Sequence, residues 1–95
     1  MSCDASNYAC NGGWPYLAME YVAEKGINTE AGYPYTAGQG SVAACEADQH
    51  PKASVKVDSY ALVPQSEDQI MSWVAHVGPV SVSLDAMTQL WWPYT

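Results

Sequence analysis

The sequence is poor in basic residues. It has three lysines and arginines against ten aspartates and glutamates, which gives a formal net charge of −7, and the charges are spread without long runs. Nucleic acids and anionic membrane surfaces are bound through patches of positive charge. This composition therefore argues against both as partners.

Long hydrophobic runs are also missing. Charged residues, histidine, glycine or proline interrupt every apolar stretch well before the roughly 20 residues that a transmembrane helix requires. The segment Met1 to Asp4 has neither the basic region nor the apolar region of a secretory signal. We expect no membrane span and no signal peptide in this chain.

Cysteine is scarce, and its count is odd. Six residues separate Cys3 from Cys10 and thirty-four separate Cys10 from Cys45, so the paired cysteines of a zinc site are lacking. We expect no metal and no cofactor. In an oxidising compartment an odd cysteine count leaves one thiol over, whereas three reduced, buried thiols would fit a cytosolic protein.

What the sequence does have is a composition typical of globular proteins, with 48% hydrophobic residues, four tryptophans and seven tyrosines. Its most informative segment is Cys-Asn-Gly-Gly-Trp-Pro at residues 10–15. Gly12 and Gly13 lack a Cβ, so another extended backbone could come within hydrogen-bonding distance, as in a peptide-binding cleft. Asn-Gly-Gly is equally an ordinary turn sequence, so the segment alone leaves both interpretations open.

Two helices are predicted from the spacing of apolar residues. The first covers about residues 14–25, begins with a tryptophan-proline pair and ends at Gly26. Before the second, Ser66 and Gln69 form a capping-box pattern, and the apolar stripe that follows predicts a helix over residues 67–77.

The remaining segments predict loops and strands. Residues 28–51 are rich in small and polar residues and form a long loop, which Cys45 and the aromatic cluster at 33–35 would hold. An extended stretch is predicted over 53–63. Alternation of apolar and polar residues over 80–84 predicts a strand with one buried face. The predicted fold class is α+β.

Several landmarks recur in an order and at spacings that resemble the middle of a papain-family cysteine protease. They are Cys3-Asp4, Cys10-Asn11-Gly12-Gly13-Trp14-Pro15, Gly26-Ile27, Tyr33-Pro34-Tyr35, Cys45, Trp73-Val74-Ala75 and Gly78-Pro79-Val80-Ser81-Val82. The resemblance runs from Ser2 to about Ala86. It implies an internal fragment of the mature catalytic domain, with residues 1–52 from the end of the helical lobe and 53–95 from the start of the sheet-rich lobe, neither complete. The part from the sheet-rich lobe would supply a helix and antiparallel strands.

The resemblance also places the catalytic residues outside this chain. The family's nucleophilic cysteine lies upstream of this region, and its histidine and asparagine lie far downstream. A thiolate nucleophile needs a base within reach and a third group that orients the base. No residue here matches these roles, so we expect the chain alone to be inactive. We interpret His50 and His76 as surface histidines.

The same resemblance assigns the cysteines. The counterparts of Cys3 and Cys45 form a disulfide, which would contribute about 3 to 4 kcal/mol by restricting the unfolded chain. The counterpart of Cys10 bonds to a cysteine near the nucleophile, so the resemblance implies an unpaired thiol at Cys10 in this sequence.

Substrate-binding residues follow from the resemblance as well. Gly12 and Gly13 match the strip that pairs with the backbone of the bound peptide. Trp14 matches a subsite wall, although it also starts the apolar face of a helix. Ser83 matches a wall of the main specificity pocket or else faces solvent, and Ala86 matches the leaving-group side. The full predicted set is Asn11, Gly12, Gly13, Trp14, Pro15, Ser83 and Ala86.

The predicted function is that of a segment of a papain-like cysteine endopeptidase, whose parent hydrolyses peptide bonds in peptide or protein substrates. The resemblance implies a lysosomal, vacuolar or secreted location. Two alternatives remain open. One is a non-catalytic peptide-binding module that keeps the docking loop, and the other is a small structural protein stapled by a disulfide.

Overall fold

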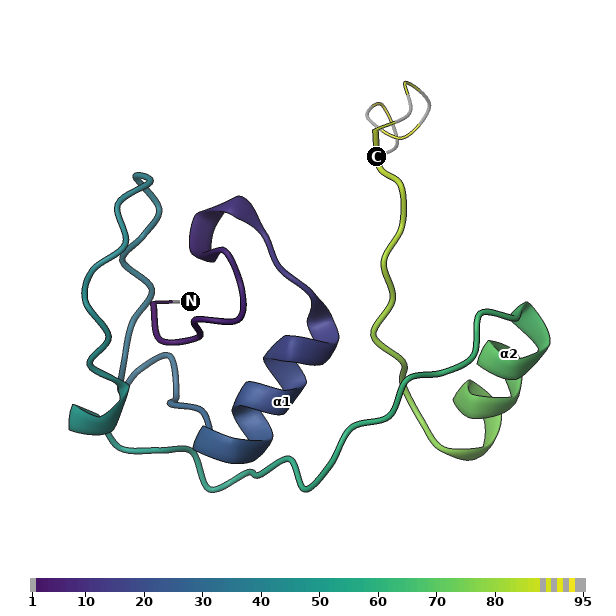
Figure 1. The fold of residues 1–95 in the computed structure, drawn as a ribbon, viewed down its shortest axis with the longest axis horizontal. Helices are drawn as coiled ribbons and strands as arrows, with labels where there is room; N and C mark the ends of the chain where they lie inside the picture. Colours follow the sequence, from purple (N-terminus) through teal and green to yellow (C-terminus); the bar gives the residue numbers. More distant parts are fainter. Residues whose placement is uncertain (1, 88, 90, 92, 94–95) are drawn as a thin grey trace. The chain divides into compact units, whose positions relative to one another are not determined.

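The computed structural model of the chain describes residues 2–87, 89, 91 and 93. The chain divides into two compact units, Met1–Leu62 and Val63–Thr95. The first unit holds the 3-10 helix η1 (Ala9–Asn11), the helix α1 (Pro15–Lys25) and the 3-10 helix η2 (Ala47–Gln49), and the second unit holds the helix α2 (Glu67–His76) (Figure 1).

The helix α1 confirms the first predicted helix to within one residue. Trp14 is its extended N-cap residue and Pro15 occupies its first position, where a missing N–H costs nothing. The first backbone bond runs from the Ala18 N–H to the Trp14 carbonyl oxygen over 3.2 Å. Gly26 ends the helix with φ +72°, and its N–H donates to the Val22 carbonyl over 2.9 Å.

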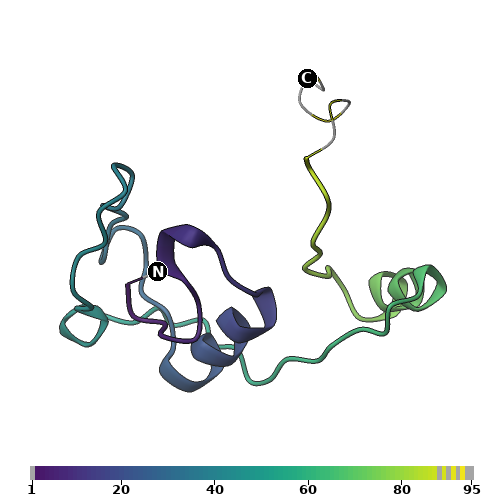
Figure 2. The same ribbon diagram turned by 45° about the horizontal axis from the view of Figure 1, so that its top comes forward.

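The long loop after α1 is held by a covalent bond and by side chains. The expected disulfide joins Cys3 to Cys45, whose Cα atoms are 4.8 Å apart. An isolated antiparallel bridge pairs Asn28 with Lys52 at the two ends of the loop. The loop carries the short helix η2, and its course is seen from two angles in Figures 1 and 2. A long segment is therefore positioned with little regular secondary structure.

The helix α2 confirms the second predicted helix. Ser66 is its N-cap residue, and the Ile70 N–H donates to the Ser66 carbonyl over 2.9 Å. The Ser66 side chain makes no capping hydrogen bond, so the bond expected from the capping-box pattern is not formed. Val77 is the C-cap residue of the helix, its N–H donates to the Trp73 carbonyl, and Gly78 follows with φ +143°.

The predicted strands are wrong for the part of the chain that the structure describes. Residues 53–63 and 80–84 contain no named strand, and the bridge between Asn28 and Lys52 is isolated. A strand is defined by backbone hydrogen bonds to a neighbouring strand. Alternating side chains predict an extended segment, but these segments have no ladder partner among the described residues. The antiparallel sheet part of the α+β prediction is therefore corrected.

Burial is low throughout the described residues. The buried hydrophobic residues among them are Ala37, at 8% exposure, and Ala47, at 5%. Large apolar side chains are exposed in both units, and they include Trp14, Ile27, Val55, Leu62, Met71, Val77, Val82 and Leu84. Within the same residues, no helix combines the length and the apolar character needed to cross a lipid bilayer. Exposed apolar surface of this extent is typical of a surface that another segment covers.

Candidate functional site

The segment that precedes α1 leads through η1 to the first turn of the helix (Figures 1 and 2). Side chains and backbone of this segment and of α1 line a small hollow. We call it the diglycine hollow. Its volume is about 310 Å³. It is lined by Asp4, Asn7, Ala9, Gly12, Gly13, Trp14, Pro15 and Ala18. Four of the predicted substrate-binding residues therefore share one hollow.

A chain of hydrogen bonds through Asn7 shapes this hollow. The Asn7 Nδ2 donates to the Asp4 Oδ2 over 2.5 Å, and the Trp14 N–H donates to the Asn7 Oδ1 over 2.6 Å. The Ser6 N–H also donates to the Asp4 Oδ1 over 2.9 Å, so the carboxylate is held on both oxygens. Bonds to a charged carboxylate are stronger than neutral ones. Asp4 and Asn7 therefore fix the loop to the start of α1.

Gly13 is required at its position because of the space around it. A Cβ built on Gly13 would overlap with the side-chain amide of Asn7, so a larger residue would displace the amide that accepts from Trp14. The Gly13 N–H and C=O make no hydrogen bond to any residue that the structure describes. Unpaired backbone groups on an exposed residue can pair with an extended ligand.

Gly12 is required for a different reason. Its φ of +100° with ψ −163° is a conformation that residues with a side chain rarely adopt, while the space beside it is open. Its carbonyl accepts from the Tyr8 N–H over 3.0 Å, and the Asn11 N–H donates to the Tyr8 carbonyl over 2.9 Å. The Gly12 carbonyl is thus used within the loop, whereas that of Gly13 is not.

An aromatic wall stands beside the two glycines. Trp14 is 56% exposed although it caps α1, and its ring centroid lies 6.4 Å from that of Tyr16, with the planes tilted by 38°. Pro15 is exposed next to it. An exposed tryptophan beside unpaired backbone groups offers apolar contact together with hydrogen bonds, a combination common in ligand sites.

The remaining predicted site residues lie elsewhere. Asn11 is exposed and adjoins the diglycine hollow in sequence without lining it. Ser83 and Ala86 belong to the second compact unit, outside its helix, where Ser83 is exposed and Ala86 is half-buried. Cys10 is exposed at the middle of η1. The structure thus brings together four of the seven residues that the sequence predicts to bind substrate.

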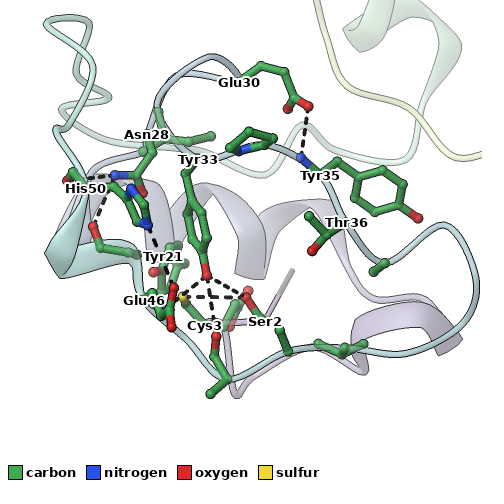
Figure 3. Close-up of a pocket in the computed structure, with 18 of the residues that line it drawn as sticks. Ser2, Cys3, Tyr21, Asn28, Glu30, Tyr33, Tyr35, Thr36, Glu46 and His50 are labelled. Carbon is green, nitrogen blue, oxygen red and sulfur yellow. Dashed lines mark hydrogen bonds and ion pairs between the residues drawn. The ribbon is translucent and has the colours of Figure 1, made fainter.

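A second, larger hollow of about 580 Å³ lies in the first unit (Figure 3). The Tyr33 ring stacks on His50, with centroids 4.6 Å apart and planes 11° apart. The Tyr33 hydroxyl accepts from the Glu46 N–H over 3.0 Å and points toward Ser2, as Figure 3 shows. The Asn28 Nδ2 donates to three carbonyl groups over 3.0 to 3.1 Å. These contacts hold the long loop together, and we assign this hollow a structural role.

One tyrosine of the first unit has a shifted pKa. Burial, followed by the negative charges of Asp48 and Asp4, raises the pKa of Tyr21 above its ordinary value. His76 is exposed, with its Nδ1 2.8 Å from the Ser72 carbonyl. Across the described ranges, no group of three or more histidine, cysteine or acidic side chains is arranged to hold a metal ion.

Two polar residues of the diglycine hollow, Asp4 and Asn7, are not among the site residues that the sequence predicts. Asp4 belongs to a landmark of the family pattern, and none of the quoted landmarks includes Asn7. A signal was available, because aspartate followed three residues later by asparagine is typical of a side-chain-stabilised turn. That signal predicts a turn, however, and not the reach of the Asn7 amide to Trp14.

Comparison with known proteins agrees with these landmarks. Residues 1–95 match the papain family of cysteine proteases. Zingipain-1 of Zingiber officinale is 37% identical over 87 residues, which cover 90% of this chain and 38% of that protein. Cysteine proteinase A of Leishmania mexicana is 35% identical over 91 residues, which cover 93% and 25%. Cathepsin M of Mus musculus is 38% identical over 81 residues, which cover 84% and 23%.

The match extends over the whole chain and includes relatives of widely separated organisms. The chain therefore belongs to the papain family of cysteine proteases. It spans 38% or less of the length of the three relatives named above. This family of peptidases acts on peptide substrates.

Proposed function

We propose that this chain supplies part of the substrate cleft of a papain-like cysteine endopeptidase. Gly13 pairs with the backbone of the bound peptide, and Trp14 and Pro15 contact an apolar side chain of that peptide. Ser83 and Ala86, in the second unit, contribute to substrate binding in the parent enzyme. Residues 1–52 belong to the helical lobe of the parent enzyme, and residues 53–95 belong to its sheet-rich lobe.

The observation that carries this proposal is the state of the Gly13 backbone. Its N–H and C=O are without partners among the described residues, and they lie at a hollow whose wall includes an exposed tryptophan. A peptide in extended conformation presents an N–H and a C=O on the same edge, which matches this pair of groups. The side-chain amide of Asn7 occupies the space that a larger side chain at position 13 would need.

The proposal assigns the chemistry to residues outside this chain. His50 is stacked on Tyr33 and lies 3.8 Å from Glu46, and His76 lies at the end of α2 in the second unit. The side-chain contacts described for the two histidines are to Tyr33, Glu46 and Ser72, and none is to a cysteine. The chain alone is therefore proposed to bind peptide without hydrolysing it. The disulfide between Cys3 and Cys45 supports a lysosomal, vacuolar or secreted location, because such bonds persist in oxidising compartments.

Peptide binding tests the docking strip directly. We expect a capped dipeptide with an aromatic side chain to shift the amide resonance of Gly13 in the 15N-labelled chain. A depsipeptide analogue, in which an ester oxygen replaces the N–H that donates to Gly13, should bind roughly tenfold more weakly, because one hydrogen bond is lost. Equal binding of the two ligands would contradict the pairing with Gly13.

A matched pair of variants tests the role of Gly13. Gly13→Ala should lose binding, because its methyl group displaces the Asn7 amide. Gly38→Ala is the control, since its added Cβ would meet the Tyr35 ring at an ordinary 3.7 Å. Binding without turnover of a fluorogenic dipeptide fits the proposal, and turnover by the isolated chain would contradict it. Absence of binding would favour a structural role instead.

A further inference from the structure

We propose that Asn11 is a site of spontaneous deamidation, and that the free backbone amide of Gly12 makes it so. This inference concerns the chemical stability of the chain and goes beyond its proposed function. It rests on the contrast between the three asparagines of the sequence, Asn7, Asn11 and Asn28. The hydrogen bonds of two of them hold their amides in place, and the third is exposed.

The reaction uses only the chain and water. The backbone nitrogen of Gly12 loses its proton and attacks the Asn11 Cγ, a C–N bond forms, and the bond from Cγ to Nδ2 breaks. The side-chain nitrogen leaves as ammonia, and a five-membered succinimide ring remains. Water then opens the ring at one of its two carbonyl carbons. The products are aspartate or isoaspartate at position 11, and each adds one negative charge.

The amides of Asn7 and Asn28 are engaged on several sides. Asn7 donates to Asp4 and accepts from the Trp14 N–H. Asn28 shares the hydrogens of Nδ2 among the carbonyl oxygens of Ala47, His50 and Pro51, and it is half-buried. Rotating either side chain toward the next backbone nitrogen would break these bonds, which adds to the barrier.

Asn11 has none of these restraints in the described part of the chain. Its side chain makes no hydrogen bond to a described residue, and both Asn11 and Gly12 are exposed to water. The Gly12 N–H, which must lose its proton, likewise makes no hydrogen bond there. Space for a Cβ at Gly12 is open, and glycine allows the backbone to rearrange toward the ring.

Deamidation at this position would alter the docking strip, a consequence that rests on the proposed function. Isoaspartate inserts an extra backbone carbon two residues before Gly13, and both products add charge next to the apolar wall formed by Trp14. Peptide docking would weaken as the chain ages. The modification itself does not depend on docking and is measured independently of it.

The test compares deamidation in the native chain with deamidation in guanidinium chloride, by peptide mapping after incubation in 18O-labelled water at mildly alkaline pH. We expect equal rates at Asn11 in both conditions. At Asn7 and Asn28 we expect rates at least roughly tenfold lower in the native chain than in denaturant. The variant Asn11→Gln should remove the product, because glutamine would have to close a six-membered ring. That closure is far slower than closure of the five-membered ring from asparagine.

A matched control separates the free amide from the sequence Asn-Gly. The variant Gln39→Asn creates a second exposed Asn-Gly pair, but the Gly40 N–H donates to the Ala37 carbonyl over 2.9 Å. This pair should react several times more slowly than Asn11 in the native chain and equally fast in denaturant. Equal native rates at the two pairs, or protection of Asn11 equal to that of Asn28, would overturn the proposal.

Discussion

The two compact units are held together by different kinds of interaction. In the first unit, bonds join residues far apart in sequence: the disulfide spans 42 positions, and the contact between Ser2 and Tyr33 spans 31. In the second unit, the hydrogen bonds described for residues 63–87 join close neighbours, such as Val77 to Trp73 and Met87 to Asp85. The long-range bonds of the first unit thus contrast with the local hydrogen bonds described for residues 63–87.

This difference bears on how each unit responds to perturbation. Long-range bonds restrict the unfolded chain and order loops that have no helix or strand. Local hydrogen bonds stabilise only the helix or turn to which they belong. An isolated helix shorter than about 12 to 15 residues has marginal stability in water. The helix α2 has 10 residues and none is buried. We therefore expect variants in the first unit to have the larger effects.

Removal of the disulfide should have the largest effect. The double variant Cys3→Ala/Cys45→Ala should lose about 3 to 4 kcal/mol of unfolding free energy in the first unit, because its unfolded chain gains freedom. Hydrogen exchange should accelerate at the amides of residues 28–51 and stay unchanged in α2. A reducing agent should change the native chain in the same way and leave the variant unaffected. Equal acceleration in α2 would remove the distinction between the units.

Loss of the Asn28 side chain should have the next largest effect. Asn28→Ala leaves the carbonyl groups of Ala47, His50 and Pro51 without their shared donor, at a cost of about 1 to 3 kcal/mol. Denaturant unfolding monitored in the first unit measures this cost. Gln39→Ala is the control, because Gln39 is exposed and no side-chain hydrogen bond is described for it. Similar costs for the two variants would show that these bonds do not hold the loop.

Substitution of the N-cap residue of α2 should have a smaller effect. An N-cap serine usually contributes about 1 kcal/mol through its side-chain bond, but Ser66 makes none, so Ser66→Ala should cost a few tenths of a kcal/mol. Far-ultraviolet dichroism and amide exchange in α2 report the change. As a reference, Ala75→Gly within the exposed part of α2 should cost about 1 kcal/mol. A larger loss for Ser66→Ala than for the reference variant would contradict the observed cap.

The smallest effect is expected at alkaline pH. The pKa of Tyr21 is raised by burial and by Asp48, so the folded first unit holds the phenol proton more tightly than the unfolded chain does. The resulting stability is complete below the ordinary value of 10.0 and is lost as the pH rises through the higher pKa of the folded state. Tyr21→Phe should reduce this alkaline loss, whereas Tyr60→Phe, at an exposed tyrosine, should not.

Sequence reasoning was most accurate where the signal was local. Both helices were predicted because apolar spacing, Pro15 and Gly26 act within a few residues of where they stand. The strand predicted over residues 80–84 was wrong, because alternation describes one segment, whereas a strand depends on a neighbour. The capping bond of Ser66 failed for a related reason, since a pattern permits a hydrogen bond without ensuring its geometry.

For the candidate site, the sequence by itself determined the family and supplied the motif of the proposed docking strip, because a motif such as Asn11-Gly12-Gly13 lies within one short segment. Tertiary structure decided which backbone groups of that strip are available. The Asn7 Oδ1 accepts from the Trp14 N–H across seven positions, and the Gly12 carbonyl accepts from the Tyr8 N–H. The N–H and C=O of Gly13 make no hydrogen bond to a residue that the structure describes. Which backbone groups form hydrogen bonds within the loop depends on its three-dimensional path. Residue types and their spacing do not determine that path.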